Sequence, residues 1–200
     1  DELNRQLKPF GLWFPVDVST SSRATIGGMA GNNSAGGRSI RYGIMRDNVL
    51  SINTILSDGS KAHFGLAKKG LRGLEKVFPK LIKIAEKNQK EIETRYPKVL
   101  RRVGGYNLDA LLPDTLASRP GSIGNEKDIN LSHLIVGSEG TLAYSTSIKL
   151  KLSPLPPPKI MALCHFSTFY EAMDSAQHIV KLDPIAVELI DSTMISLGRS

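Results

Sequence analysis

The sequence has almost no cysteine, few aromatic residues and no long apolar run. Cys164 is the one cysteine among 200 residues, so no disulfide can form within the chain, and this usage fits a reducing compartment. The apolar runs are far shorter than a membrane span requires. The N-terminus has neither the basic nor the apolar region of a signal peptide. These absences predict a chain with no transmembrane segment and a cytoplasmic location, either free or peripheral to a membrane.

Basic residues are in excess, with 26 lysines and arginines against 19 acidic residues and a net charge of +7. Much of the excess lies in residues 61–102, where acids are interleaved with bases, as is typical of a solvated helical face. A basic balance also suits an anionic ligand or a nucleic acid. Because aromatic residues make up only 6% of the chain, a base-stacking platform and a nucleic-acid partner are not expected. A non-catalytic module that binds an anion or a nucleic acid stays open as an alternative.

Short helical and strand-like patterns alternate along the chain, which predicts an α+β fold. Residues 1–11 have the pattern of a helix closed at Gly11. Alternating apolar residues around Asp58-Gly59 predict a hairpin with a type I′ turn. Three- and four-residue spacings over residues 69–96 predict an amphipathic helix interrupted at Pro79.

The second half of the chain contains turn-forming and proline-rich stretches. Residues 113–130 are dense in turn formers and predict a loop, and residues 131–152 predict a strand, a glycine turn and a second strand. The prolines of residues 153–159 suit an extended linker, so we place a domain boundary between residues 153 and 154.

A strand, helix and strand are expected after this boundary. Residues 160–166 and 184–191 are the expected strands, and Cys164 would lie buried in the first. The helix between them would be capped by Ser167 or Thr168, with Glu171 near the third helical position. The region 154–200 therefore predicts a β-α-β unit.

Residues 24–43 are rich in glycine and asparagine, which disfavours a helix. The stretch contains neither a Walker loop nor a dinucleotide-binding fingerprint. Two glycine pairs, Gly27-Gly28 and Gly36-Gly37, bracket the polar residues 32–34 and would let backbone N–H groups approach a flat or anionic ligand. A set of tight turns in an antiparallel sheet explains the same pattern equally well.

A second glycine-rich stretch, residues 136–144, places Glu139 among small residues at the expected strand-to-strand turn. By itself it fits a capped turn with an exposed glutamate. Two such turns, each beside strand-like sequence, suit one extended ligand held along a sheet. Together they favour a bound cofactor.

The order of the motifs resembles that of FAD-linked oxidases of the vanillyl-alcohol oxidase and p-cresol methylhydroxylase (PCMH) superfamily. The motifs are ATIGGMAGNNSAGGRSIRYG, GGYNLDAL, IVGSEGTLA and IKLKLSPLP. The closest resemblance is to D-lactate dehydrogenases, glycolate oxidase flavin subunits and D-2-hydroxyglutarate dehydrogenases. The stretch YPKVLRRVGGYNLDALL is similar to members that also carry an iron–sulfur module.

The resemblance implies an architecture and an activity. Residues 1–153 would form the second subdomain of a PCMH-type FAD-binding domain, an antiparallel sheet with flanking helices. Residues 154–200 would begin a ferredoxin-like substrate cap, and the subdomain with the pyrophosphate loop would not be in this chain. The implied activity is dehydrogenation of a 2-hydroxy acid by hydride transfer to flavin N5. Another oxidase or reductase of the superfamily is the alternative, and an iron–sulfur module or another electron-transfer protein is the implied partner.

The resemblance also implies which residues contact FAD. They lie in three stretches: Ser19, Thr20, Ser21, Ser22, Thr25, Gly27 and Gly28; Asn32, Asn33, Ser34 and Ala35; and Glu139, Gly140, Thr141, Leu142, Ala143 and Tyr144. Ala143 and Tyr144 depart from the family pattern. Arg101, Arg102, Tyr106 and Asn107 would either reach the flavin or the substrate, or form an ordinary helix end.

No catalytic residue and no metal ligand are expected in this chain. The family's substrate-binding and catalytic residues would come from later segments. The four histidines, His63, His133, His165 and His178, lack metal-ligand spacing and are expected to be surface or structural residues.

Overall fold

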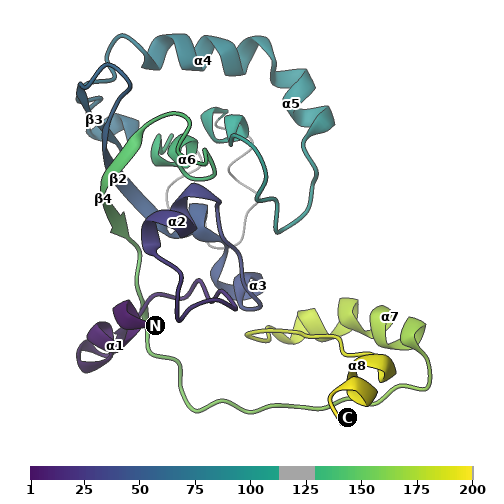
Figure 1. The fold of residues 1–200 in the computed structure, drawn as a ribbon. Coiled ribbons are helices and arrows are strands. Elements are labelled where there is room, and N and C mark those ends of the chain that lie inside the picture. Colours follow the sequence, from purple (N-terminus) through teal and green to yellow (C-terminus); the bar gives the residue numbers. More distant parts are fainter. Residues whose placement is uncertain (113–128, 200) are drawn as a thin grey trace.

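The computed structural model describes residues 1–112 and 129–199 (Figure 1). Short helices surround a small sheet in the main body, and an extended segment leads from the sheet to two helices that lie to one side (Figure 1). The mixture of helix and antiparallel sheet confirms the α+β class.

The main sheet has three antiparallel strands in the order β3-β2-β4. The central strand β2 (Val49–Ile55) pairs with β3 (Lys61–Phe64) on one side and with β4 (Tyr144–Leu150) on the other. Ile52 faces Phe64 in the first pairing and Ile148 in the second, so apolar side chains line up across the sheet. The sheet therefore presents one apolar face to the core.

The predicted hairpin is confirmed, but its turn is not of type I′. Gly59 has a φ of 81°, whereas Asp58 is not left-handed as a type I′ turn requires. The N–H of Leu56 donates to the Ser60 carbonyl at 2.8 Å, and that of Gly59 donates to the Leu56 carbonyl. The loop is longer than the two-residue connection that the Asp-Gly pair predicted.

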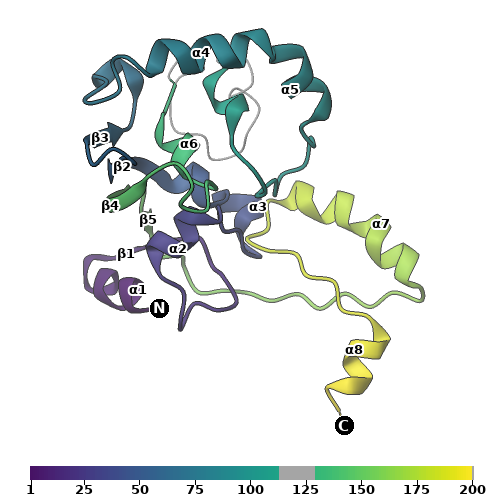
Figure 2. The ribbon, with the colours of Figure 1, turned by 45° about the horizontal axis from the view of Figure 1, so that its top comes forward.

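A second, two-stranded pairing joins the start of the chain to the segment after β4. Strand β1 (Leu12–Trp13) pairs antiparallel with β5 (Ser153–Pro154). The junction proposed between residues 153 and 154 lies within β5. Figure 2 shows these two short strands beside the N-terminal helix.

The helices are short. Helix α1 (Glu2–Leu7) and the 3-10 turn that follows end at Gly11 with a φ of 69°, as predicted. The other α-helices are α2 (Ile26–Gly31), α3 (Ser39–Tyr42), α4 (Phe78–Lys87), α5 (Gln89–Arg95), α6 (Ser132–Ile135), α7 (Phe169–Ile179) and α8 (Ser192–Leu197). The 3-10 turns are η1 (Lys8–Phe10), η2 (Met45–Asn48), η3 (Ala67–Lys69), η4 (Leu108–Leu111) and η6 (Val180–Leu182).

The predicted interruption at Pro79 is wrong, because the helical region breaks at Asn88. Pro79 occupies the first turn of α4, where an N–H would have no intrahelical partner, so the proline is tolerated there. Residues 70–77 precede the helix as irregular structure and turns.

Two further sequence expectations are wrong: the glycine-rich residues 26–31 form the helix α2, and residues 132–135 form the helix α6 where a strand was expected. In α2 the Thr25 hydroxyl accepts a hydrogen bond from the Gly28 N–H at 3.1 Å, and Met29 and Ala30 are buried. A side-chain cap and a buried inner face thus offset the low helix propensity of glycine.

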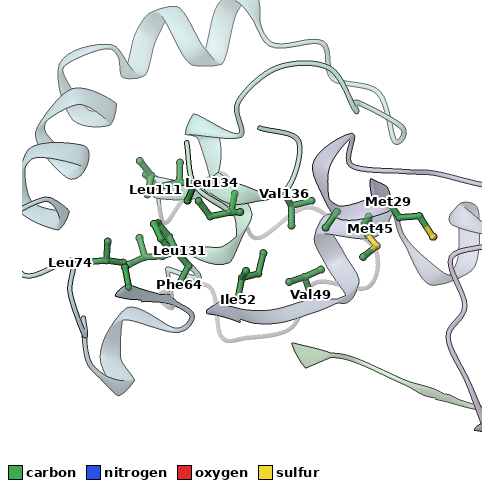
Figure 3. Packing of buried hydrophobic residues seen from close by; sticks show 14 of the residues in the cluster. Met29, Met45, Val49, Ile52, Phe64, Leu74, Leu111, Leu131, Leu134 and Val136 are labelled. Atoms are coloured by element: carbon green, nitrogen blue, oxygen red, sulfur yellow. The ribbon is translucent and has the colours of Figure 1, made fainter. Parts of the chain in front are cut away.

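The hydrophobic core lies between the sheet and the helices (Figure 3). Ile52 at the centre of β2 is fully buried. The other labelled members of the cluster are Met29, Met45, Val49, Phe64, Leu74, Leu111, Leu131, Leu134 and Val136. They come from described segments between residues 29 and 136, so these segments pack around one core.

The C-terminal region differs from the prediction, since neither expected strand forms in residues 160–166 or 184–191. Ile160 is 98% exposed, and Cys164 is exposed and not buried as expected. A strand needs a neighbour to complete its hydrogen bonds, and no described residue pairs with these segments. Helix α7 is confirmed, with Thr168 and Glu171 forming the expected capping box.

Candidate cofactor site

Exposed backbone distinguishes the first turn of α2. Gly27 and Gly28 are both exposed, and a Cβ placed on Gly27 would meet no atom within 4 Å. At Gly28 the added Cβ would lie 3.1 Å from the capping Thr25 hydroxyl. The open space above Gly27 therefore gives a ligand direct access to the main chain, as a flat or anionic group requires.

Residues 19–25 lead into this turn as a polar loop, as expected. Ser19, Thr20 and Ser22 are exposed and Ser21 is half-buried. The N–H of Ala24 donates to the Thr20 carbonyl at 2.9 Å and closes the loop immediately before the Thr25 cap. The structure thus places the expected hydroxyl-bearing stretch next to the exposed glycines.

Asn33 holds the end of α2 in place. It is fully buried and left-handed, with a φ of 51°, a conformation that asparagine adopts more readily than most residues. Its side-chain oxygen accepts a hydrogen bond from the main-chain N–H of Arg46 at 2.9 Å. Its side-chain nitrogen donates to the main-chain carbonyl of Arg102 at 3.5 Å. The side chain of Asn33 is thus used within the protein, whereas Asn32 is exposed and Ser34 and Ala35 are half-buried.

The two glycine-rich stretches are joined by main-chain hydrogen bonds. The N–H of Gly137 donates to the Ala30 carbonyl at 2.8 Å, and the N–H of Glu139 donates to the Gly31 carbonyl at 2.9 Å. The end of α2 and the turn after α6 are therefore fixed side by side. The sequence analysis expected both stretches to hold one extended ligand along a sheet, and in the structure main-chain hydrogen bonds join them directly.

The turn of residues 137–141 has an unusual backbone. Gly137, Glu139 and Gly140 have φ values of 85°, 52° and 74°. The left-handed conformation costs a non-glycine residue such as Glu139 about 1 kcal/mol, and such residues cluster at binding sites. A Cβ on Gly137 would lie 3.2 Å from the Asn33 Cβ, so a side chain there would crowd Asn33, and the positive φ also favours glycine.

The outer side of this turn combines polar and apolar groups. Glu139, Gly140, Thr141 and Leu142 are exposed, and Tyr144 at the start of β4 is 73% exposed. Ala143 points into the core at 9% exposure. Main-chain groups beside apolar side chains suit a cofactor that has both polar and aromatic parts.

Beneath the turn lies a buried ionic network that sequence reasoning found only in part. Arg46 Nη1 lies 2.7 Å from Asn107 Oδ1 and 3.4 Å from Asp109 Oδ2, and Arg102 Nη2 lies 2.5 Å from Asp109 Oδ1. Burial lowers the pKa of Arg46, which Asp109 partly offsets. The sequence analysis left open whether Arg102 and Asn107 reach the flavin or form a helix end, and their side chains belong to this network. Arg101 is exposed, and the Tyr106 hydroxyl lies 2.7 Å from the Thr141 hydroxyl of the turn.

The histidines do not form a metal site. No cluster of metal-ligating side chains occurs among the described residues. His133 in α6 has a buried Nδ1, and burial, followed by the charge of Arg46, lowers its pKa to about 3, so the ring is neutral. His63 Nδ1 lies 2.7 Å from Asn53 Oδ1, while His165 and His178 are exposed.

In the part of the chain that the structure describes, no helix is both long and apolar enough to cross a membrane.

Comparison with known proteins gives matches to one group. Residues 1–65 match the family described as FAD binding domain. The whole chain is similar to D-2-hydroxyglutarate dehydrogenase of Pseudomonas putida, with 31% identity over 208 residues that cover 99% of this chain and 19% of that protein. The same enzyme of Escherichia coli is 29% identical, with 100% and 19% coverage. A probable mitochondrial D-lactate dehydrogenase of Danio rerio is 32% identical, with 97% and 29% coverage. The chain thus spans about a fifth of the length of the first two relatives.

Proposed function

We propose that this chain holds part of the FAD in a dehydrogenase of D-2-hydroxy acids. Residues 1–65 match the FAD binding domain family, and the chain is similar to D-2-hydroxyglutarate and D-lactate dehydrogenases. The family relationship and the cofactor expected from the motifs are confirmed by these matches. The substrate class, the activity and the partners of the whole protein are part of the proposal.

One observation carries the assignment of the site. Two main-chain hydrogen bonds, from Gly137 to Ala30 and from Glu139 to Gly31, join the two stretches that the motifs assign to FAD. The exposed residues of both stretches therefore belong to two segments that are joined directly. The open space above Gly27 fits a bound group at this position.

Each stretch has a distinct part in this proposal. The hydroxyl-bearing residues 19–22 and the exposed backbone of Gly27 and Gly28 bind polar parts of the cofactor. The turn around Glu139 supplies further main-chain groups, and Leu142 and Tyr144 contact its apolar surface. Bound FAD supplies the acceptor for the hydride that leaves the hydroxyl-bearing carbon of the substrate. We assign no catalytic base to this chain.

The division of the chain belongs to the same proposal. Residues 1–153 would serve the cofactor, and residues 154–200 would begin the unit that covers the substrate. The relatives' names favour D-2-hydroxyglutarate or D-lactate as substrate. The resemblance implies an iron–sulfur module or another electron-transfer protein as partner. A cytoplasmic location, free or peripheral to a membrane, is part of the proposal and rests on the single cysteine and the short apolar runs.

The substitution Gly27→Ala in the complete natural protein tests this site. Its methyl group meets no protein atom and the backbone is helical, so the fold should be kept or slightly stabilised. The same methyl group would occupy space proposed for the cofactor. We expect FAD affinity, measured by flavin fluorescence titration, to fall at least about tenfold.

Gly198→Ala is the matched control, since it makes the same change after α8 at a residue with a negative φ. It should leave FAD affinity within about twofold of wild type. FAD affinity unchanged by Gly27→Ala would remove the α2 backbone from the proposed site.

A further inference from the structure

A closed loop of residues 102–109, the 102–109 loop, lies against the Glu139 turn. Its two ends are joined by the 2.5 Å ion pair between Arg102 and Asp109, and both side chains are buried, with exposures of 7% and 10%. The Arg102 guanidinium also lies over the Tyr96 ring, 4.3 Å from its centroid. A buried ion pair with further hydrogen bonds fixes the loop in one geometry.

Asn107 connects this loop to the segment immediately before the turn. Its Oδ1 accepts from Arg46 at 2.7 Å and from Arg102 at 3.2 Å. Its Nδ2 donates to the carbonyls of His133 at 3.0 Å and of Val136 at 2.8 Å. The carboxamide therefore uses both donors and both acceptor positions, and it fixes the main chain on which the turn begins.

Tyr106 connects the loop to the other end of the turn. Its hydroxyl lies 2.7 Å from the Thr141 hydroxyl, which itself donates to the Ser138 carbonyl at 2.6 Å. The Tyr96 hydroxyl donates to the Tyr106 carbonyl at 2.9 Å and so helps to hold the main chain at Tyr106 in place. Adjacent residues of one loop thus hold the turn at both of its ends.

We propose that the 102–109 loop is a clamp that positions the Glu139 turn for FAD, with Asn107 fixing the start of the turn and the Tyr106–Thr141 hydrogen bond fixing its end. This inference rests on the proposed function of the turn. Tyr106 and Asn107 are positioning residues: they act through the turn, and their own contact with the cofactor is not needed.

The backbone of the turn supplies the physical reason for a clamp. Glu139 is left-handed, and a strained residue keeps such a conformation only where its surroundings over-determine it. A turn that is already ordered loses less entropy when a ligand binds, so the clamp should raise affinity without a contact of its own. Loss of one hydrogen bond of the clamp should therefore weaken FAD binding and leave the core intact.

Tyr106→Phe in the complete natural protein tests the clamp, with Tyr170→Phe as the matched control. Both changes remove one hydroxyl, but only the first breaks the bond to Thr141, and Tyr170 in α7 is 78% exposed. We expect Tyr106→Phe to weaken FAD binding about tenfold and Tyr170→Phe by less than twofold. Apo-protein thermal midpoints should stay within about 2 °C of wild type for both variants.

Variants of Thr141 separate positioning from a general structural effect. Thr141→Ser keeps the hydroxyl and should bind FAD as wild type does. Thr141→Val should lose at least as much affinity as Tyr106→Phe, because it also removes the bond to the Ser138 carbonyl. The double variant of Tyr106→Phe and Thr141→Val should bind FAD no more weakly than the single variant that binds it less tightly, because both substitutions remove the Tyr106–Thr141 hydrogen bond. Effects that simply add, or equal losses with Tyr170→Phe, would contradict the clamp.

Amide exchange of the apo protein provides a readout that needs no FAD. In Tyr106→Phe the amides of residues 138–141 should exchange at least about threefold faster, while those of β2 should not change. Unchanged exchange together with normal FAD binding would overturn the clamp alone. A wild-type protein that takes up no FAD would overturn the proposed function, and the clamp's role in binding with it.

Discussion

The first 150 residues and the last 45 have similar mixtures of helix-forming and strand-forming sequence, yet the first region is packed and the second is open. Ile52 in β2 is fully buried, whereas Ile160 in an equally apolar stretch is 98% exposed. Helix α7 contains no buried residue, and α2, which is shorter, buries two. The difference shows which signals act locally and which need a partner segment.

Helices form in both regions because their signals are local. Thr25 caps α2 and Thr168 caps α7, each through its own side chain. Strands occur only where another strand is within reach, as β2 is for β3 and β4. The stretch around Ile160 finds no such partner among the described residues, so Ile160, Met161 and Leu163 stay exposed.

Contact between the two regions is limited. Arg41 in α3 forms an ion pair with Asp183 at 3.3 Å, and the Asp183 side chain is 77% exposed. An exposed pair of this kind contributes about 0–1 kcal/mol. The regions should therefore respond to substitution almost independently.

The largest expected difference comes from shortening an isoleucine in each region of the 200-residue chain. Ile52→Ala should lower the free energy of unfolding by about 2–5 kcal/mol, because it leaves a cavity in the core. Ile160→Ala should change it by less than about 0.5 kcal/mol. Urea unfolding measures both, and a large loss with Ile160→Ala would show that the second region is packed.

A buried histidine should make the first region sensitive to pH. Because the pKa of His133 is lowered to about 3 from 6.5, the unfolded chain binds a proton below pH 6.5 that the folded chain does not. Stability should fall as the pH decreases through this range, by up to about 1.4 kcal/mol per pH unit from this group.

Urea unfolding between pH 7.5 and 5 tests this dependence. His133→Asn should show a shallower slope than wild type, whereas His178→Asn in the exposed α7 should keep the wild-type slope. The same slope in His133→Asn as in wild type would show that the ring is not buried in its neutral form.

The smallest expected effects come from the two threonine caps. Loss of either hydroxyl, as in Thr25→Ala or Thr168→Ala, costs its helix about 1 kcal/mol. Because α2 is packed into the core, Thr25→Ala should lower global stability by this amount. Thr168→Ala should only speed amide exchange in α7, and an equal global loss would contradict the separation of the regions.

The sequence predicted best what depends on neighbouring residues. The hairpin at Asp58-Gly59, the Gly11 helix end and the Thr168 capping box were all predicted from a few adjacent residues. The helix α2 was missed because its glycines outweighed the Thr25 cap, and the buried Met29 and Ala30 could not be inferred without their partners.

The site was predicted as separate stretches without its scaffold. Glycines flanking polar residues identified both stretches, since bare backbone leaves a local pattern. The contact between Arg46 and Asn107 joins residues 61 positions apart and leaves no periodic signal. The hydrogen bonds of Asn107 and Tyr106 to the Glu139 turn are likewise non-local, so no motif reveals them.

Amide hydrogen exchange of the complete natural protein, with and without FAD, tests the central claim most directly. The account predicts that FAD protects residues 26–35 and residues 137–144 together, because main-chain hydrogen bonds join them into one site. Residues 160–191 should change little. Protection of only one of the two stretches, or of neither, would contradict a cofactor site built from both.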